Sequence, residues 1–430
     1  MLIITIAAWA LVIFALAIYR PAWAVWAVII GSPLYLLRTD ILGIPTTALE
    51  LGIYAVAIIF AINWARQDKL ATKLLNFYNL FKSYRWPLLI WLGFTLLSAI
   101  LSPEWRLSFG ILKGWFFDPL LLVLLLTSLE NNEDVLNPKS VAAYGLIGAG
   151  TIIAAYGIYD YIFGYTFETG RLDAFYTSPN YAAMFLGPAL VVSLAMLKQK
   201  WESRYKIPLI ITTSLIFIAL LMTRSFGGYV AILISLLIGT AVSNLAVRWR
   251  AALASALIIA AGLALMAGAI QLSGHYNNFY RVGSWQIRNE LWRAAAAMIK
   301  QKPLTGVGLG YFQRELPRLR VSRPDLFQLK SELLKFHLPH NLYLTVAAES
   351  GVLALLGFVW FVGQWLYLAR RSYKMTNEII ILGYLAAMMV ILVHGLVDTT
   401  YFKNDLAVLF WLIISMALLT APSRVTAVPR

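Results

Sequence analysis

Long apolar runs recur along the whole chain, with short polar segments between them. A helix of about 17–25 apolar residues is long enough to cross a bilayer. Because such a helix pairs its own backbone groups, a chain of this kind predicts an all-α, polytopic transmembrane helical bundle. Two runs are short, so we expect 12 or 13 membrane spans, at 2–19, 22–37, 47–64, 87–101, 109–129, 140–163, 180–197, 207–223, 228–246, 251–272, 341–368, 379–397 and 406–421.

The composition supports this class. The chain is 60% hydrophobic and 13% charged, whereas soluble domains carry about 25% charged residues. The first apolar stretch is followed by Arg20-Pro21 rather than by a small-residue cleavage site, which is not the pattern of a signal peptide. We therefore expect residues 1–430 to form a single integral-membrane domain.

Few residues are suited to bind a metal. Cysteine is absent, which excludes disulfides, thiolate metal sites and a cysteine nucleophile. The chain has four histidines, and no paired acidic cluster has the spacing of metal ligands; the histidines are His275, His337, His340 and His394. We expect neither a metal nor another cofactor.

The distribution of basic residues predicts the orientation. Alternate short connections and the C-terminal tail carry 18 Lys or Arg, while the opposite short loops carry six. Since short cytoplasmic loops are enriched in Lys and Arg, the first set and the C-terminus are expected to be cytoplasmic. The long segment 273–340 then lies outside, where we expect it to form a helical cap on the periplasmic side.

This outer loop is unusually basic. It holds 11 Lys or Arg against four acidic residues, so its net charge is near +7. One interpretation is a solvated face or adhesion to anionic lipid head groups. The other is an anion site at the membrane surface, since arginine suits bidentate phosphate contacts and several arginines can hold a diphosphate.

The loop contains two predicted helices. Ser284 can cap a helix that runs to about Lys300 and is stopped by Pro303. Arg288 and Trp292 share one face, next to an apolar stripe of Ile287, Leu291, Ala294 and Met298. The glycines of 306–310 predict a tight turn with close backbone packing, not a dinucleotide site. Residues 313–335 then predict an amphipathic helix on the outer leaflet, with Pro317 near its start.

Two further arginines lie at outer membrane boundaries. Arg171 is in the short loop 164–179, and Arg224 lies between two spans with almost no loop. A charge so close to hydrocarbon costs about 1–3 kcal/mol unless it snorkels or is paired. Snorkelling is the simple explanation, but both arginines fall on the same predicted side as Arg288 and His340, which favours a function.

The stretch that begins Pro339-His340-Asn341 is the most informative in the chain. Histidine can accept or donate a proton near neutral pH, and His340 lies where the outer loop re-enters the membrane. It is either a catalytic group or an interfacial histidine that caps the next helix. His337 is a competitor. His394 and Asp398, four residues apart, are interpreted as packing or supporting groups rather than catalysts.

The ordered set of these motifs resembles the O-antigen ligase and polymerase superfamily over residues 165–405. The matching segments are Thr223-Arg224-Ser225, Arg288 with Trp292, Lys302 to Phe312, Pro339 to Leu344, Glu349-Ser350-Gly351 and His394 to Asp398. Any one of these motifs is weak, but their order, spacing and topology all agree.

The resemblance implies a bacterial inner-membrane glycosyltransferase with a periplasmic active site. Its donor would be an undecaprenyl-diphosphate-linked glycan, and in ligases its acceptor would be the lipid A–core of lipopolysaccharide. The protein would be surrounded by membrane lipids and would bind no nucleic acid. His340 would act on the acceptor hydroxyl, while Arg224 and Arg288 would bind the diphosphate, with Arg171 as a third ligand and Arg38 as a fourth. Asn341, His337 and Trp292 would support the site. Arginine charge can replace a divalent metal in stabilising a departing diphosphate.

Three functions remain open. A ligase is favoured by the single long outer loop and the lack of an extra soluble domain. The alternatives within the superfamily are an O-antigen polymerase or a protein O-glycosyltransferase that uses the same kind of donor. A flippase or other transporter is a third possibility, but the sequence lacks the internal repeat and the midplane charge cluster that transporters tend to carry.

Overall fold

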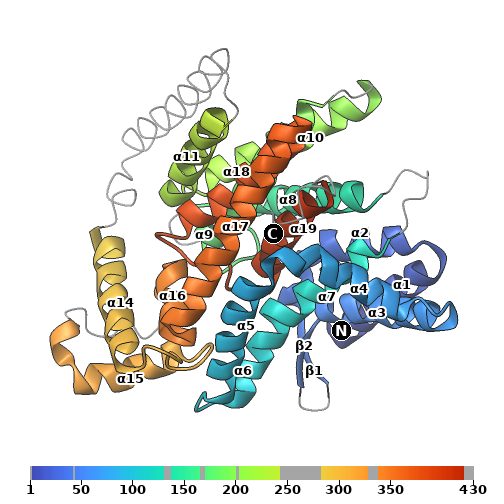
Figure 1. Cartoon of the computed structure of the whole chain (residues 1–430). Coiled ribbons are helices and arrows are strands. Elements are labelled where there is room, and N and C mark those ends of the chain that lie inside the picture. Colours follow the sequence, from blue (N-terminus) through green and yellow to red (C-terminus); the bar gives the residue numbers. More distant parts are fainter. Residues whose placement is uncertain are drawn as a thin grey trace, which may run out of the picture.

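The computed structural model describes residues 2–41, 44–129, 137–164, 170–199, 203–242, 282–327 and 338–420, and within these ranges most of the chain is helical (Figure 1). The predicted all-α polytopic bundle is confirmed. Seven described helices are long and apolar enough to cross a membrane: α1 (Leu2–Tyr19), α3 (Ala48–Arg66), the continuous α6–η3–α7 (Trp105–Thr127), α8 (Pro138–Ile162), α9 (Pro179–Leu197), α10 (Ser203–Met222) and α17 (Val352–Thr376).

Four shorter apolar helices complete the membrane part of the described chain: α2 (Pro21–Ile30), α11 (Phe226–Val242), α18 (Ile379–His394) and α19 (Asn404–Thr420). A further helix, α5 (Arg85–Ile100), packs along α17. α18 packs against α9 and α11, and α19 is apolar on all sides and almost wholly buried. An all-round apolar helix belongs in the centre of a bundle. The predicted span 251–272 lies outside the described residues.

Local structure departs from the predicted spans near the N-terminus. The run 22–37 is a ten-residue helix, α2, followed by a 3-10 turn, η1 (Ser32–Leu36). The polar stretch after it forms an antiparallel hairpin of β1 (Arg38–Ile41) and β2 (Ile44–Thr47), paired from Arg38↔Thr47 to Ile41↔Ile44. The basic segment 66–85, expected to be a loop, contains the helix α4 (Leu70–Phe81) and a 3-10 turn, η2 (Lys82–Tyr84).

The predicted span 341–368 is two helices, because the chain breaks at Gly351. α16 (Leu342–Ser350) ends there and α17 begins. Gly351 has φ +90°, and a Cβ on it would lie 2.1 Å from the carbonyl oxygen of Leu304. Gly306 approaches the backbone of Glu349 equally closely, with φ +66°. Only glycine allows this crossing, which places the glycine-rich segment directly over the junction of α16 and α17.

The outer-loop helices form a second small core. α14 (Val282–Gln301) presents its predicted apolar stripe to α15 (Phe312–Ser322), which is shorter than the predicted helix 313–335 and is followed by a 3-10 turn, η4 (Pro324–Leu326). Pro317 lies inside α15. The buried residues of this core include Leu291, Ala294, Met298, Phe312, Leu316 and Leu319.

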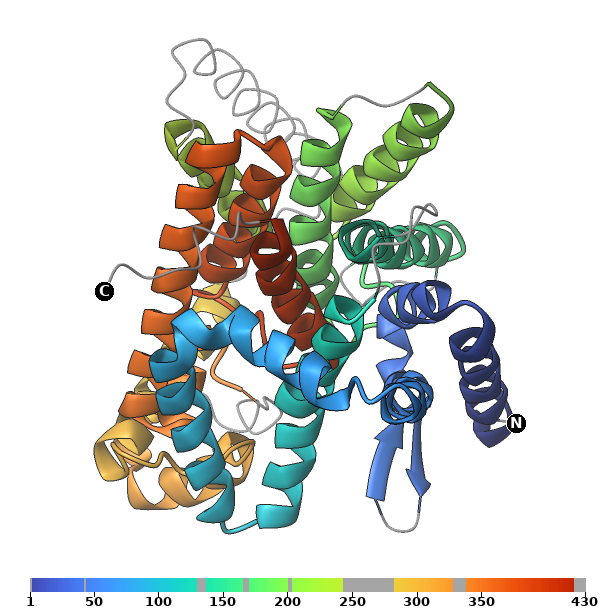
Figure 2. The same ribbon diagram turned by 45° about the vertical axis from the view of Figure 1, so that its right-hand side comes forward.

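The segments predicted to be outside gather at one end of the bundle. In Figures 1 and 2 the hairpin β1–β2, the turn between α5 and α6, and the helices α14 and α15 all lie at the lower end. α17 runs from this end, beside α16, to the opposite end (Figure 1).

Candidate functional site

Asp398, in the segment between α18 and α19, joins residues from distant parts of the chain. Its Oδ1 lies 2.8 Å from Nδ1 of His340 and accepts the backbone N–H of Thr399 at 3.1 Å. Its Oδ2 accepts a hydrogen bond of 2.9 Å from the side-chain amide of Asn180. The guanidinium of Arg288 approaches the same Oδ2 to 3.6 Å. One buried carboxylate thus connects α9, α14 and the start of α16.

The charges around Asp398 keep it ionised. Burial by itself raises the pKa of this carboxyl, because the charged form loses its hydration. The neighbouring His340, Arg288 and His394 lower the pKa by more, so that it falls below its usual range. Asp398 is therefore an acceptor for its donors at neutral pH.

His340 is held in a defined orientation. It precedes α16, and its backbone has φ 52°, in the left-handed region. Asn341 caps α16: its side-chain oxygen accepts the N–H of Leu344 at 2.9 Å, and its amide donates to the carbonyl of Leu396 at 2.8 Å. With Nδ1 directed at Asp398, Nε2 is the ring nitrogen that would face a reacting hydroxyl, and the side chain is 21% exposed.

Arg288 reaches the same segment from α14. Its Nε donates to the carbonyl oxygen of Val397 at 2.9 Å, and its side chain is 17% exposed. The contact fixes the base of the guanidinium beside Asp398. Because a guanidinium carries five donors in a planar fork, this anchoring still allows bidentate contact with a phosphate.

Arg171 and Arg224 come together on the other side of Asn180. Nε of Arg171 donates to the carbonyl of Thr223 at 2.8 Å, and its terminal nitrogen donates to the side-chain oxygen of Asn180 at 3.0 Å. Arg224 follows Thr223 directly, is half-buried and has φ 48°. Hydrogen bonds thus link Arg171 through Asn180 to the carboxylate of Asp398, and Arg224 follows directly the residue whose carbonyl binds Arg171.

We refer to Asp398, His340, Arg288, Asn180 and Arg171 as the Asp398 cluster. With His340 neutral, the two arginines and the carboxylate leave a net charge of +1, and the adjacent Arg224 adds a further positive charge. This surplus can attract an anion with two or more negative charges. A histidine and a positively charged group of side chains are therefore adjacent.

The other described candidates are not hydrogen-bond or ion-pair partners of the Asp398 side chain, although His394 lies near enough to Asp398 to lower its pKa. His394, the last residue of α18, is 1% exposed, and its Nδ1 makes no hydrogen bond within the described part of the chain. It packs close to Gly227. Arg38 begins β1 and is exposed, and Trp292 lies on α14 beside Trp285. His337 lies outside the described residues. His394 is thus a packing residue, as interpreted from the sequence.

A second buried carboxylate fixes α16 from the opposite side. Glu349 is 0% exposed and accepts the backbone N–H groups of Gly310 at 2.9 Å and Phe312 at 3.3 Å. Burial raises the pKa of its carboxyl to about 8, although these two hydrogen bonds act in the opposite direction. Glu349 ties the glycine-rich segment, and through it α14 and α15, to the helix that follows His340.

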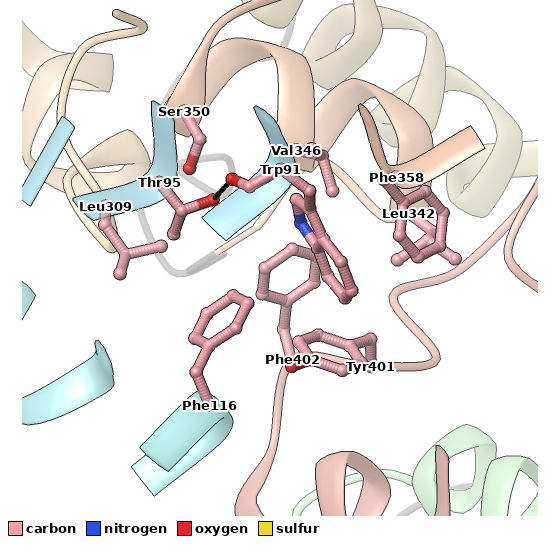
Figure 3. Close-up of a pocket in the computed structure, with 10 residues that line it drawn as sticks. All are labelled: Trp91, Thr95, Phe116, Leu309, Leu342, Val346, Ser350, Phe358, Tyr401 and Phe402. Atoms are coloured by element: carbon pink, nitrogen blue, oxygen red, sulfur yellow. Dashed lines mark hydrogen bonds between the residues drawn. The ribbon is translucent and has the colours of Figure 1, made fainter. Parts of the chain in front are cut away.

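A small internal cavity lies behind α16 (Figure 3). It offers about 10 Å³ to the centre of a water molecule, the minimum that one water needs. Its ten lining residues are mostly apolar: Trp91, Thr95, Phe116, Leu309, Leu342, Val346, Ser350, Phe358, Tyr401 and Phe402. Neither a sugar nor a lipid chain fits this space.

Metal ligands do not converge in the described ranges. No group of three or more His, Asp or Glu side chains there could hold a metal ion. The positive charge of the Asp398 cluster comes from arginine and, when it is protonated, from His340.

Two members of the cluster were not identified as site residues from the sequence. Asp398 was interpreted only as a packing or supporting residue, and Asn180 only as part of the segment that opens α9. The available signal for Asp398 was an acidic residue at the end of a long apolar run, in a chain with few acidic residues. Nothing local marks Asn180, because its role depends on contacts with residues more than 200 positions away.

Comparison with known proteins gives one match. Residues 211–359 match the family model described as O-antigen ligase, a range that contains Arg224, Arg288, Trp292, His340 and Asn341. A search of curated proteins found no match. The matched family comprises glycosyltransferase-like enzymes, and with the seven apolar helices it indicates a multi-pass inner-membrane protein. Over residues 211–359 the chain is therefore similar to the O-antigen ligase family.

Proposed function

We propose that this protein transfers a glycan from undecaprenyl diphosphate to a hydroxyl of the lipid A–core, on the periplasmic side of the inner membrane. The observation that carries this proposal is the convergence of His340, Arg288 and Asp398, from three segments far apart in the sequence. A base beside a cationic anion site is what glycosyl transfer from a diphosphate requires.

In the proposed reaction, Nε2 of His340 takes the proton of the acceptor hydroxyl. The hydroxyl oxygen attacks the anomeric carbon of the first sugar, and the bond from that carbon to the diphosphate oxygen breaks. The electron pair of this bond leaves with undecaprenyl diphosphate. A positioned base contributes about 10²–10⁴-fold to such a step.

Asp398 orients the base. A carboxylate at Nδ1 selects the tautomer with its proton on that nitrogen, which leaves Nε2 able to accept a proton. It also stabilises the imidazolium that forms during transfer, as in other carboxylate–histidine pairs. Asp398 is thus a positioning residue, and it acts through His340.

Arg288, Arg224 and Arg171 stabilise the leaving group. Negative charge grows on the diphosphate as its bond to the sugar breaks, and fixed guanidinium groups stabilise this charge more than that of the ground state. The carbonyl contacts of Arg288 and Arg171 hold both side chains in place before the donor binds. Little reorganisation is then needed during the reaction.

The test is reconstitution of the full chain in proteoliposomes. Supplied with undecaprenyl-diphosphate-linked glycan and lipid A–core, it should yield glycosylated lipid A–core, detected by gel mobility and mass spectrometry. His340→Ala is the matched control. Donor alone distinguishes the alternatives: a polymerase lengthens the donor glycan, whereas a ligase leaves it unchanged. Movement of the donor between leaflets without any new covalent product would indicate a transporter.

A further inference from the structure

Two tryptophans flank Arg288 on α14. The ring centroids of Trp285 and Trp292 are 5.5 Å apart, and the rings meet edge to face at 77°. Trp285 precedes Arg288 by three residues and Trp292 follows it by four, so the three side chains lie on one side of the helix. That side is the one from which Arg288 reaches the Asp398 cluster.

These rings are not part of the packing of α14. The helix packs on α15 and α16 through a different stripe, which includes Leu291, Ala294 and Met298. Trp285 is 59% exposed. Trp292 is half-buried, so the exposed ring of Trp285 is the part of the pair available to a ligand, as is common for tryptophan at binding surfaces.

Trp292 also has a polar group without an acceptor. Its indole Nε1–H is shielded from solvent, yet within the described part of the chain it makes no hydrogen bond. A buried donor left unpaired costs about 1–3 kcal/mol, so tryptophan N–H groups usually find an acceptor. If the indole ring shifts when a ligand binds, so that its N–H meets a ligand hydroxyl, this penalty is removed.

A sugar ring matches both features. A pyranose has faces of C–H groups, which carry partial positive charge and are attracted to the negative face of an indole ring, and an edge of hydroxyls that accept hydrogen bonds. Along a helix, three to four residues correspond to about 4.5–6 Å, close to the size of one sugar ring. A sugar attached to a diphosphate at Arg288 would therefore lie within reach of the two rings.

We propose that Trp285 and Trp292 form a carbohydrate subsite, which stacks a sugar ring of the substrate beside the group bound at Arg288. This inference rests on the proposed function, because that function supplies the diphosphate at Arg288. Both possible ligands offer a pyranose ring: the glycan of the donor and the core of the acceptor. The competing role is that of an interfacial anchor, since tryptophan is enriched at membrane surfaces.

Two substitutions separate stacking from anchoring. Trp285→Tyr keeps a flat aromatic face, whereas Trp285→Leu keeps apolar area and loses that face. Trp105→Leu is the matched control, because Trp105 on α6 is also exposed (55%), meets an aromatic ring edge to face and lies beside an arginine. Affinities of the full chain in nanodiscs are measured for three lipids: undecaprenyl-diphosphate-linked glycan, sugar-free undecaprenyl diphosphate, and lipid A–core.

Stacking predicts that Trp285→Leu weakens binding of a sugar-bearing lipid about 5- to 10-fold and leaves binding of the sugar-free lipid unchanged. Trp285→Tyr and Trp105→Leu should stay within about twofold of wild type. Trp292→Phe keeps an aromatic ring and loses the N–H. It should weaken binding of the same lipid by a smaller factor. The lipid that responds, donor glycan or lipid A–core, identifies which sugar occupies the subsite.

Equal affinities of Trp285→Leu and wild type for both sugar-bearing lipids would overturn the subsite. A loss shared by all three lipids would also overturn it, in favour of anchoring. These readouts are binding constants, so they are independent of catalysis. A tryptophan-dependent affinity for sugar in a protein that transfers nothing would leave the subsite standing and reject the proposed function.

Discussion

The segment between α18 and α19 has two different environments only three residues apart. Tyr401 enters an aromatic core around Trp91, whose ring lies within 6.2 Å of six others: Phe116, Phe358, Phe361, Tyr401, Phe410 and Trp411. Asp398 enters the polar cluster with His340 and Arg288. The same short stretch of chain therefore connects an aromatic core of the bundle to the part that we propose is reactive.

The difference lies in how each region is held together. Contacts in the aromatic core are numerous and individually weak, so many of them remain when one is lost. The Asp398 cluster depends on a single carboxylate, and without it Arg288, the Asn180 amide and the His340 imidazole lose their shared partner. We infer that the aromatic core governs stability with little direct effect on chemistry, while the cluster governs chemistry with less effect on stability.

The largest expected effect is the loss of the base. His340→Ala should reduce the transfer rate in proteoliposomes about 10²–10⁴-fold, while the protein still inserts and still binds donor lipid. Asp398→Asn should approach this loss, because the imidazole is then no longer oriented by a charge. His337→Ala is the control and should cost much less. Near-normal transfer by His340→Ala would return His340 to the role of a helix cap.

The aromatic core should show the opposite pattern. Trp91→Ala removes the ring that stacks on Trp411 at 5.8 Å and 13°, and should lower the free energy of unfolding by about 3–5 kcal/mol. Chemical unfolding in detergent measures this. Transfer by the folded fraction should change little. Trp86→Ala, on the same helix but 56% exposed, is the matched control and should be nearly neutral. A loss of rate without a loss of stability would contradict the division between the two regions.

Replacing Arg288 by lysine tests whether the cluster provides geometry or only charge. Lysine keeps the positive charge but loses the planar fork and the Nε contact with Val397. Arg288→Lys should therefore lower the rate about 10- to 100-fold, less than the ~10²–10³-fold that removal of a stabilising donor can cost. Steady-state rates at saturating donor measure this. If Arg288→Lys and Arg224→Lys both retain wild-type rates, these residues are generic surface charge.

Glu349 allows a finer test, because its carboxyl contributes to pH-dependent stability. Its pKa in the folded protein is raised to about 8, so the folded state keeps a proton that the unfolded chain has already released. Stability from this group is present at low pH and lost as the pH rises towards 8, by at most about 1.4 kcal/mol per pH unit. The free energy of unfolding of the wild type should therefore fall relative to that of Glu349→Gln as the pH rises from 5 to 8. Chemical unfolding of both proteins across this pH range measures the difference. Identical slopes would mean that Glu349 is ionised throughout.

The smallest expected effect is that of chelation. Excess EDTA should leave the initial rate of transfer unchanged, since arginines are available to stabilise the diphosphate and the described side chains offer no cluster of metal ligands. If EDTA abolishes activity and a divalent cation restores it, a metal ion stabilises the diphosphate leaving group. The arginines would then have another role.

Sequence patterns located most of the helices and singled out candidate site residues, but they did not predict the aromatic core. Apolar runs located the helices, because a span needs length and hydrophobicity and both can be read locally. The break at Gly351 was missed, since the apolar run continues across it. His340, Arg288 and Arg171 were found because charged or titratable residues are rare near hydrocarbon. Asp398 and Asn180 were missed as partners, because hydrogen bonds that span more than 200 residues leave no local pattern.

The left-handed backbone of His340 bears on how this protein could be engineered. His340 and Arg224 both have φ near +50°, where a side chain with a Cβ is strained and glycine is not. Selection for thermal stability alone would therefore favour glycine at these two positions. The resulting variants would be more stable but inactive. Stabilising libraries for this chain should keep residues 224 and 340 fixed and place their diversity elsewhere.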